Sequence, residues 1–243
     1  MDLGLRGRRA LVTGASKGIG RAIAHELAAE GVDLALCARG KAVLEEAAGE
    51  ALGAGVRVFA RPLDVTDPDD VRRFVEEAAA ALGGLDIVVN SAAIMERRPL
   101  AEITPADWDR TMDLNLRGAF FVAKGAAAVL AEQGGVIVNI ADLAAFERWR
   151  GYPAHCISKA GVVAMTELLA KALAPRVRVN AVAPGAVLLP HDWEAAAKER
   201  LVSTTPLGRL GGPDDVVAAV TYLIERDYVT GETLVVDGGR RVR

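Results

Sequence analysis

The chain has 243 residues, of which 51% are hydrophobic and 25% are charged, and it carries a net charge of −3. This balance fits one large α/β domain with a substantial core and gives no attraction to nucleic acid or to an anionic membrane. The first apolar run is too short for a signal peptide or a membrane span. Cys37 and Cys156 have neither disulfide-framework nor zinc-site spacing, so we predict a cytoplasmic protein without a metal.

Short β-rich runs alternate with longer helical patterns along the whole chain. The predicted strands are 9–13, 32–37, 56–61, 87–90, 136–140, 177–182 and 234–236. The predicted helices include 18–30, 68–82, 117–133, 153–174 and 214–224. Such alternation favours a parallel sheet with helices on both faces. We therefore predict an α/β fold with a single domain over 1–243, a doubly wound Rossmann arrangement with a sheet of about seven strands.

A glycine-rich turn connects the first predicted strand to the first predicted helix. Glycines let the backbone turn sharply and approach a ligand closely, and the helix N-terminus offers free N–H groups to a pyrophosphate. Outside this strand–turn–helix context, the same run would indicate only a tight turn. The residues expected to contact a dinucleotide here are Gly14, Ser16, Lys17, Gly18, Ile19 and Gly20.

The second predicted strand ends in Leu-Cys-Ala-Arg-Gly-Lys at 36–41, without an acidic residue. A carboxylate at this place would bind the ribose 2′-OH of NAD(H), whereas a cationic group suits the 2′-phosphate of NADP(H). Arg39 can hold a phosphate with two hydrogen bonds, and Ser16 and Lys17 can add to it. These residues predict NADP(H). The alternative is that Arg39 and Lys41 are solvated loop charges.

Three later segments carry candidate catalytic residues. Asn115 lies in the segment Asp-Leu-Asn-Leu at 113–116, and Asp142 follows the fifth predicted strand. His155 and Lys159 lie four residues apart near the start of the helix at 153, so they share one face of it. In order and spacing, these motifs resemble the short-chain dehydrogenase/reductase family over essentially the whole chain. That family usually has a catalytic Tyr where this chain has His155 and a Ser where it has Asp142.

The resemblance implies roles for several residues. Lys159 would bind the nicotinamide ribose, and Asn115 would support Lys159 through a water. Ala93 replaces a usual Gly, and the Thr often found just beyond Gly185 is missing. The further cofactor contacts that the resemblance implies are Asp64, Val65, Asn90, Ala92, Pro184 and Gly185.

The replaced Tyr raises the question of how a proton would reach the substrate. His155 can donate one only when protonated, a form that the Lys159 ammonium disfavours and the Asp142 carboxylate favours. We hypothesise an acid–base pair in which His155 donates the proton and Asp142 orients it or binds the substrate. One alternative is an NADP(H)-binding protein with little or no turnover that acts as a regulator or partner subunit. In another, Tyr152 replaces the missing phenol.

The expected activity is NADPH-dependent hydride transfer to a small molecule, at a carbonyl or at a pteridine-like C=N bond. The second option follows from Asp142, because a carboxylate at this position resembles the pteridine reductase branch of the family. Segment 186–206, which includes His191 and Trp193, predicts a lid over the substrate. The resemblance also implies a homotetramer, or a dimer, paired through the helices 117–133 and 153–174. The alternative is that the small residues of these helices pack against the chain's own sheet.

Overall fold

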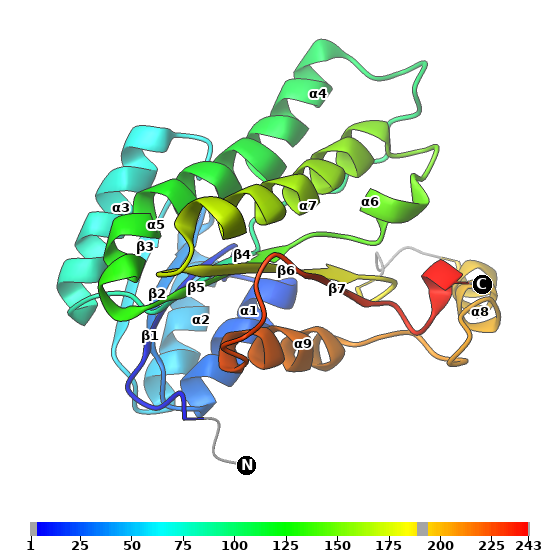
Figure 1. Ribbon diagram of the computed structural model, residues 1–243. Helices are drawn as coiled ribbons and strands as arrows, with labels where there is room; N and C mark the ends of the chain where they lie inside the picture. Colours follow the sequence, from blue (N-terminus) through cyan, green and yellow to red (C-terminus); the bar gives the residue numbers. More distant parts are fainter. Residues whose placement is uncertain (1–3, 189–193, 243) are drawn as a thin grey trace.

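The structure is a computed structural model that describes residues 4–188 and 194–242. Its centre is a sheet of seven parallel strands in the order β3-β2-β1-β4-β5-β6-β7 (Figure 1). The strands are β1 Arg9–Thr13, β2 Asp33–Ala38, β3 Val58–Pro62, β4 Ile87–Asn90, β5 Val136–Ile140, β6 Arg178–Pro184 and β7 Thr233–Val236. This sheet confirms the predicted fold, with strand bounds within two residues of those expected.

The five predicted helices are present, and further helical segments lie between them. The α-helices are α1 Gly18–Ala29, α2 Lys41–Gly53, α3 Pro68–Leu82, α4 Pro105–Met112, α5 Ala119–Gln133, α6 Ala144–Glu147, α7 Pro153–Leu173, α8 Ala195–Ser203 and α9 Pro213–Glu225. A π-helical turn, η1 Asp113–Gly118, joins α4 to α5, and a 3₁₀ turn, η2 Arg240–Val242, follows β7. The segments α2, α4, α6 and η2 lie outside the predicted elements, and η1 overlaps the predicted helix 117–133 at its last two residues.

Two helical layers cover the two faces of the sheet (Figure 1). The core on one face contains side chains of α1, α2 and α9, and the core on the other face contains side chains of α3, α5 and α7. Neighbouring residues of β1 divide between them, because Val12 packs with the first core and Leu11 with the second. Strands buried on both faces explain the continuous Val, Ile and Leu runs in the sequence.

The helical run Pro105–Gln133 is long and apolar enough to cross a membrane by length and composition, with a mean hydropathy of 1.3 over its most apolar stretch. Within that stretch, 44% of the residues are buried inside the protein. Val122, Ala123 and Leu130 belong to the core between α5 and the sheet. We therefore assign this run to the core of the domain.

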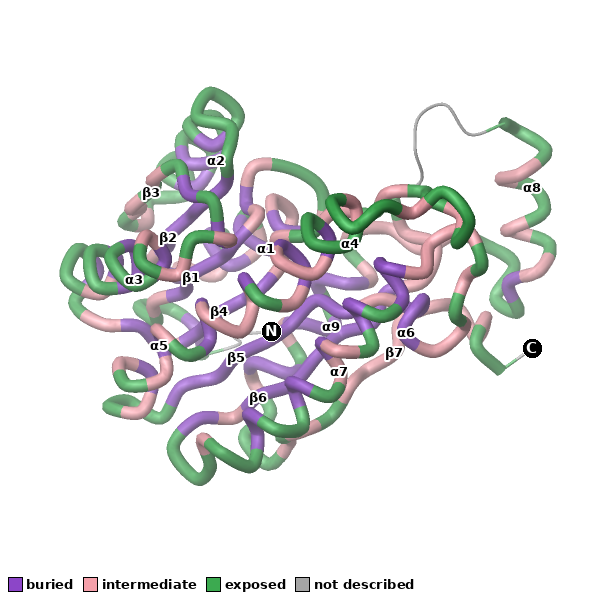
Figure 2. The backbone as a smooth tube through the Cα atoms, turned by 90° about the horizontal axis from the view of Figure 1, so that it is seen from above, coloured by how far each residue is buried: buried purple, intermediate pink, exposed green. Residues whose placement is uncertain are grey.

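The order of the strands positions a crevice. The chain winds from β1 outward to β2 and β3 and then returns to place β4 on the other side of β1. In open parallel sheets, ligands bind at such a switch point, beyond the carboxyl ends of the strands. Helix α8 and the C-terminal turn η2 lie together at one end of the molecule, and α8 contains no buried residue (Figures 1 and 2).

Candidate active site

A cavity of about 850 Å³ lies at this switch point. Its walls come from the turn between β1 and α1, the end of β2, the loops after β4, β5 and β6, and the first two turns of α7. This volume lies in the range of cavities that hold small ligands and cofactors. Strands β1, β2, β4 and β5 all end at the cavity. The sheet order therefore brings together segments that are far apart in the sequence.

The glycine turn forms a close-fitting floor for one end of the cavity. Gly14 has a φ of 65° and Gly18 a φ of 61°, which favour glycine. A Cβ added to Gly14 would lie 2.9 Å from the Ala92 nitrogen, and one added to Gly20 would collide with the Gly14 carbonyl oxygen. The first N–H groups of α1 donate no hydrogen bond to the side chain of the N-cap residue Lys17. Free N–H groups at a helix start fit a pyrophosphate.

Cationic side chains lie at the same end. Lys17 and Arg39 are exposed and line the cavity, and neither makes an ion pair in the part of the chain that the structure describes. Lys41 instead lies 3.8 Å from Glu45 on the surface of α2 and does not line the cavity. The two candidate phosphate contacts are therefore Lys17 and Arg39, and Lys41 is a solvated charge.

Two predicted cofactor residues have their side chains elsewhere. Asn90 donates to the Asn139 side chain over 2.9 Å and to the Ala119 carbonyl over 3.1 Å, so it ties β4 to β5 and α5. Asp64 accepts hydrogen bonds from the backbone and hydroxyl of Thr66 and does not line the cavity. The other predicted cofactor residues all line the cavity: Gly14, Ser16, Lys17, Gly18, Ile19, Gly20, Arg39, Val65, Ala92, Lys159, Pro184 and Gly185.

The middle of the cavity contains the predicted catalytic side chains of α7. Tyr152 precedes the helix and Pro153 begins it, at a position where a missing N–H costs nothing. One turn apart, His155 and Lys159 project from the same face, and only 3% and 4% of their surfaces are exposed. The helix therefore holds two titratable groups in a nearly dry site.

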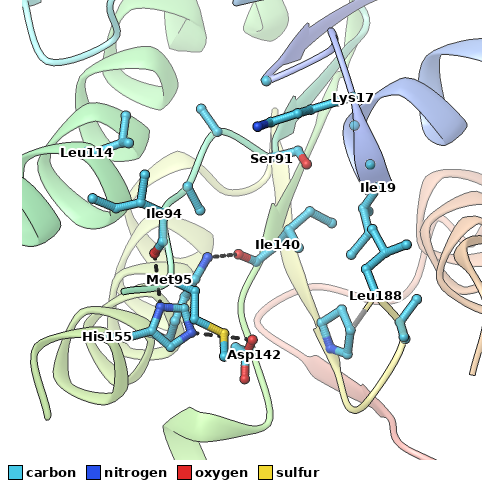
Figure 3. Close-up of a pocket in the computed structure, with 18 of the residues that line it drawn as sticks. Lys17, Ile19, Ser91, Ile94, Met95, Leu114, Ile140, Asp142, His155 and Leu188 are labelled. Carbon is cyan, nitrogen blue, oxygen red and sulfur yellow. Dashed lines mark hydrogen bonds and ion pairs between the residues drawn. The ribbon is translucent and has the colours of Figure 1, made fainter. Parts of the chain in front are cut away.

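The two ring nitrogens of His155 have different surroundings (Figure 3). Nδ1 lies 3.1 Å from the carbonyl oxygen of Ile94. Nδ1 can donate to this oxygen in the tautomer that carries its proton there, and it also lies 3.5 Å from Nδ2 of Asn115. Nε2 lies 3.4 Å from Oδ2 of Asp142, which is close enough for an ion pair but lacks hydrogen-bond geometry. The two ring nitrogens thus face a backbone carbonyl and a carboxylate.

Asp142 is held by the backbone beside His155. Its Oδ1 accepts the N–H of Ala144 over 2.7 Å, at the turn that leads into α6. The side chain is 20% exposed and lines the cavity. One carboxylate oxygen is therefore used to fix the turn, and the other faces His155. The predicted pairing of Asp142 with His155 is present in the structure.

Lys159 is fully enclosed at the end of β5. Its ammonium donates to the Ile140 carbonyl oxygen over 2.7 Å. Burial lowers the pKa of Lys159 from 10.5 to about 8, and the nearby Asp142 carboxylate opposes this shift. At pH 7 roughly nine-tenths of the side chain is still protonated. At neutral pH the site therefore contains a buried cation.

Asn115 acts on this site from behind the cavity wall. It lies in η1, a π-helical turn of the kind found at functional sites. Its amide accepts from the Ile94 N–H over 2.8 Å and donates to the Ile94 carbonyl over 2.9 Å and to the Ser158 hydroxyl over 3.1 Å. Asn115 thus positions the carbonyl that holds His155, whereas no direct hydrogen bond joins it to Lys159 among the described residues.

Several cavity residues were not predicted from the sequence. Trp149 lines the cavity and forms an edge-to-face pair with Tyr152, with ring centroids 6.1 Å apart. Ala186, Val187, Leu188 and Leu201 of the predicted lid also line it, whereas His191 and Trp193 lie outside the described residues. Other lining residues, outside the motifs described above, include Ile94, Met95 and Arg240.

Within residues 4–188 and 194–242, no group of three or more His, Cys, Asp or Glu side chains is placed to hold a metal ion.

Comparison with known proteins gives the family. The family model described as enoyl-(acyl carrier protein) reductase matches residues 14–241. The 3-oxoacyl-[acyl-carrier-protein] reductase FabG of Staphylococcus aureus is 36% identical over 239 residues, which span 96% of this chain and 97% of that protein. The chain belongs to the short-chain dehydrogenase/reductase family and is an oxidoreductase of this type.

Solved structures agree with this assignment. A short-chain type dehydrogenase/reductase from Mycobacterium marinum is 34% identical with a TM-score of 0.90, covering 98% of this chain and 97% of that chain. A blue fluorescent protein from a metagenomic library, solved in complex with NADPH, is 37% identical with a TM-score of 0.90, covering 97% of this chain and 98% of that chain.

Proposed function

We propose that this protein is an NADPH-dependent reductase in which His155 takes the place of the usual tyrosine as proton donor. The observation that carries the proposal is the placement of the imidazole, with Nδ1–H held by the Ile94 carbonyl and Nε2 next to Asp142. In the protonated ring, Nε2–H has a carboxylate beside it on the cavity side. The ring is thus oriented to deliver this proton to a substrate and to take it back from solvent.

The choice of NADP(H) is supported by the unpaired cationic side chains of Lys17 and Arg39. It is also supported by the relative that was solved in complex with NADPH. The uncapped start of α1 and the glycine floor would hold the pyrophosphate, and Val65 and Ala92 would lie against the rest of the nucleotide. When bound, NADPH supplies the hydride.

Each catalytic side chain then has one task. Lys159 would bind the nicotinamide ribose, and its positive charge would stabilise negative charge that develops on the substrate oxygen. The Nε2–H bond of His155 breaks as the proton passes to that oxygen, which leaves a neutral imidazole and an alcohol. Asp142 stabilises the imidazolium before transfer, and Asn115 keeps Ile94 in place. The sum is one hydride and one proton added to a C=O bond.

The name of the relative FabG, a 3-oxoacyl reductase, supports a substrate with a carbonyl group. A pteridine-like ring with a C=N bond is the second candidate. It is favoured by the Asp142 carboxylate, which can bind ring N–H groups, and by Trp149 and Tyr152, which can wall a flat ring. For either substrate, we propose a small molecule and a cytoplasmic location.

The test is NADPH consumption with diketones, 3-oxoacyl thioesters and dihydropterins as substrates. We expect turnover by the wild type and a 10²- to 10⁴-fold lower kcat in His155→Phe, which keeps a flat ring without the proton. His155→Tyr restores the usual donor and is the positive control. The pH–rate profiles of the wild type and Asp142→Asn test the pairing of Asp142 with His155, because identical profiles would count against it.

The competing function is nucleotide binding without turnover. It is favoured because Nε2 of His155 has no hydrogen-bond partner among residues 4–188 and 194–242, and because the Lys159 ammonium donates to the Ile140 carbonyl oxygen. Activity in His155→Tyr together with none in the wild type would reject His155 as a donor. Tight NADPH binding without turnover in either protein would instead identify a regulator or a partner subunit. An activity of His155→Phe equal to that of the wild type would point to another donor, such as Tyr152.

A further inference from the structure

We propose that Arg240 binds an anionic group of the substrate, so that the natural substrate carries a carboxylate or a similar acid. The inference rests on the proposed reductase function for the identity of the ligand as a substrate. The residue lies in the C-terminal turn η2, outside every motif described above, and its side chain lines the same cavity as Asp142, His155 and Trp149.

The fold holds the backbone of Arg240 in place. Asp237 accepts the N–H groups of Gly239 and Arg241 over 2.8 and 2.7 Å, which closes the turn before η2. Gly238 and Gly239 have φ values of 66° and 86°, and a Cβ added to Gly239 would lie 3.2 Å from Pro206. The turn is therefore pinned on both sides, and the arginine enters the cavity from a fixed position.

The guanidinium group of Arg240 is only partly satisfied. Its side chain is 14% exposed, and Nε lies 3.6 Å from Oε1 of Glu147. Its Nη1 is buried and has no hydrogen-bond partner among the described residues. Native proteins pair nearly all buried donors, and a buried charged donor that lacks a partner indicates a site for a ligand.

The carboxylate beside Arg240 is already engaged. Oε2 of Glu147 accepts the indole N–H of Trp149 over 2.7 Å, and Oε1 faces Arg240. Glu147 thus connects the aromatic wall of the cavity to the arginine and orients both. Its position on the Nε side leaves Nη1 for a second acceptor. Negatively charged hydrogen-bond acceptors bind a guanidinium most strongly, so a carboxylate fits this position best.

A neighbouring arginine provides the comparison within the same turn. The guanidinium of Arg241 lies 4.2 Å from the ring centroid of Phe146, stacked on the outside of α6. Arg241 does not line the cavity. A general attraction of this basic turn for acids would involve both arginines, whereas a built site in the cavity involves Arg240 alone.

Calorimetric titration of the protein saturated with NADP⁺ tests the inference. The ligands are 3- and 4-acetylbenzoate and the matching acetylbenzamides, which keep the flat ketone and differ mainly in the negative charge. We expect at least one acid to bind about 10- to 100-fold more tightly than its amide, as a charge-assisted hydrogen bond would give. The preference disappears in Arg240→Gln, persists in part in Arg240→Lys and is unchanged in Arg241→Gln.

Acids that bind no better than their amides, or a preference that survives in Arg240→Gln, would overturn the inference. Arg240→Lys retains the charge and guards against a loss of the folded turn in Arg240→Gln. NADPH consumption with the same ligands separates this inference from the proposed function. Turnover without acid preference would leave the reductase in place and remove the anion site. Arg240-dependent binding without turnover in any variant would support the anion site and reject the proposed reductase function.

Discussion

His155 and Lys159 have different surroundings, although they project from the same face of α7. His155 has one ring nitrogen 3.1 Å from the Ile94 carbonyl oxygen and the other 3.4 Å from the Asp142 carboxylate. Lys159 is buried, and burial disfavours its charged form. The roles proposed for these two side chains, a proton donor and a buried cation, suit charge that develops on a substrate oxygen.

The depressed pKa of Lys159 predicts a pH-dependent stability in the absence of NADP(H). Between pH 8 and 10.5 the unfolded chain keeps a proton on this lysine that the folded chain releases, so its unfavourable contribution fades as the pH rises. We expect the free energy of unfolding of the wild type to rise by about 2 kcal/mol relative to Lys159→Met over this window. Urea titrations of both proteins from pH 7 to pH 10 measure the difference, and a constant difference would contradict burial of a charged Lys159.

At the level of elements, α1 and α3 begin in opposite ways. Asp67 caps α3 by accepting the N–H groups of Asp69 and Asp70 over 3.0 and 3.1 Å. The first turn of α1 has neither a capping side chain nor an acidic residue. A capping side chain stabilises a helix by about 1 kcal/mol, so the missing cap at α1 is a cost. The same N–H groups remain free to bind a phosphate, which is a functional reason for the missing cap.

The glycine floor gives a second prediction. In Gly20→Ala the new methyl group collides with the Gly14 carbonyl, so α1 must move away from the turn. We expect the Kd for NADPH to rise at least about 10-fold, together with a loss of stability of about 1–3 kcal/mol. Fluorescence titration and thermal unfolding measure both effects.

Gly49→Ala is the matched control, because Gly49 lies within α2 and an added Cβ would meet nothing within 4 Å. This change should leave the affinity for NADPH unaltered and stabilise the protein by about 0.5–1 kcal/mol. Equal NADPH affinities of the two variants would show that the turn does not hold the pyrophosphate.

At the scale of the whole molecule, the layer of α3, α5 and α7 has one apolar part that the chain itself does not cover. The small residues Ala123 and Ala126 of α5 pack into the chain's own core, as the second of the two predicted arrangements has it. On the outer side, Leu168 of α7 is 61% exposed. A shallow depression of about 470 Å³ there is lined by Met112, Asp113, Leu116, Arg117, Phe120, Gly161, Met165 and Leu168.

We propose that this surface pairs two copies of the chain, as the family resemblance implies, and that the assembly is a homotetramer or a dimer. Leu168→Lys should then lower the molecular mass measured by analytical ultracentrifugation, because a buried lysine without a partner opposes association. Leu52→Lys changes a leucine of α2 that is 55% exposed and should leave the mass unchanged. A wild type that sediments as a monomer would exclude the pairing, as would a Leu168→Lys assembly of undiminished size.

Local patterns predicted much of this protein. The alternation of apolar strands and helices gave the fold because each pattern depends on residues close in sequence. The glycine turn, Arg39 and the spacing of His155 and Lys159 identified most of one cavity for the same reason. Asn90 and Asp64 were placed by resemblance alone, and their side chains lie outside the cavity lining, where Asn90 donates to Asn139 and Asp64 accepts from Thr66.

The sequence by itself determined the sheet, the phosphate-binding turn and the identities of the titratable side chains, since these follow from local periodicity and residue chemistry. Only the tertiary structure decided how these groups meet. The Ile94 carbonyl oxygen lies 3.1 Å from one ring nitrogen of His155, burial lowers the pKa of Lys159, and turn η2 brings Arg240 to a cavity whose other walls come from earlier in the sequence. Hydrogen-bond geometry and desolvation depend on which residues are neighbours in space, and local sequence patterns do not determine these neighbours.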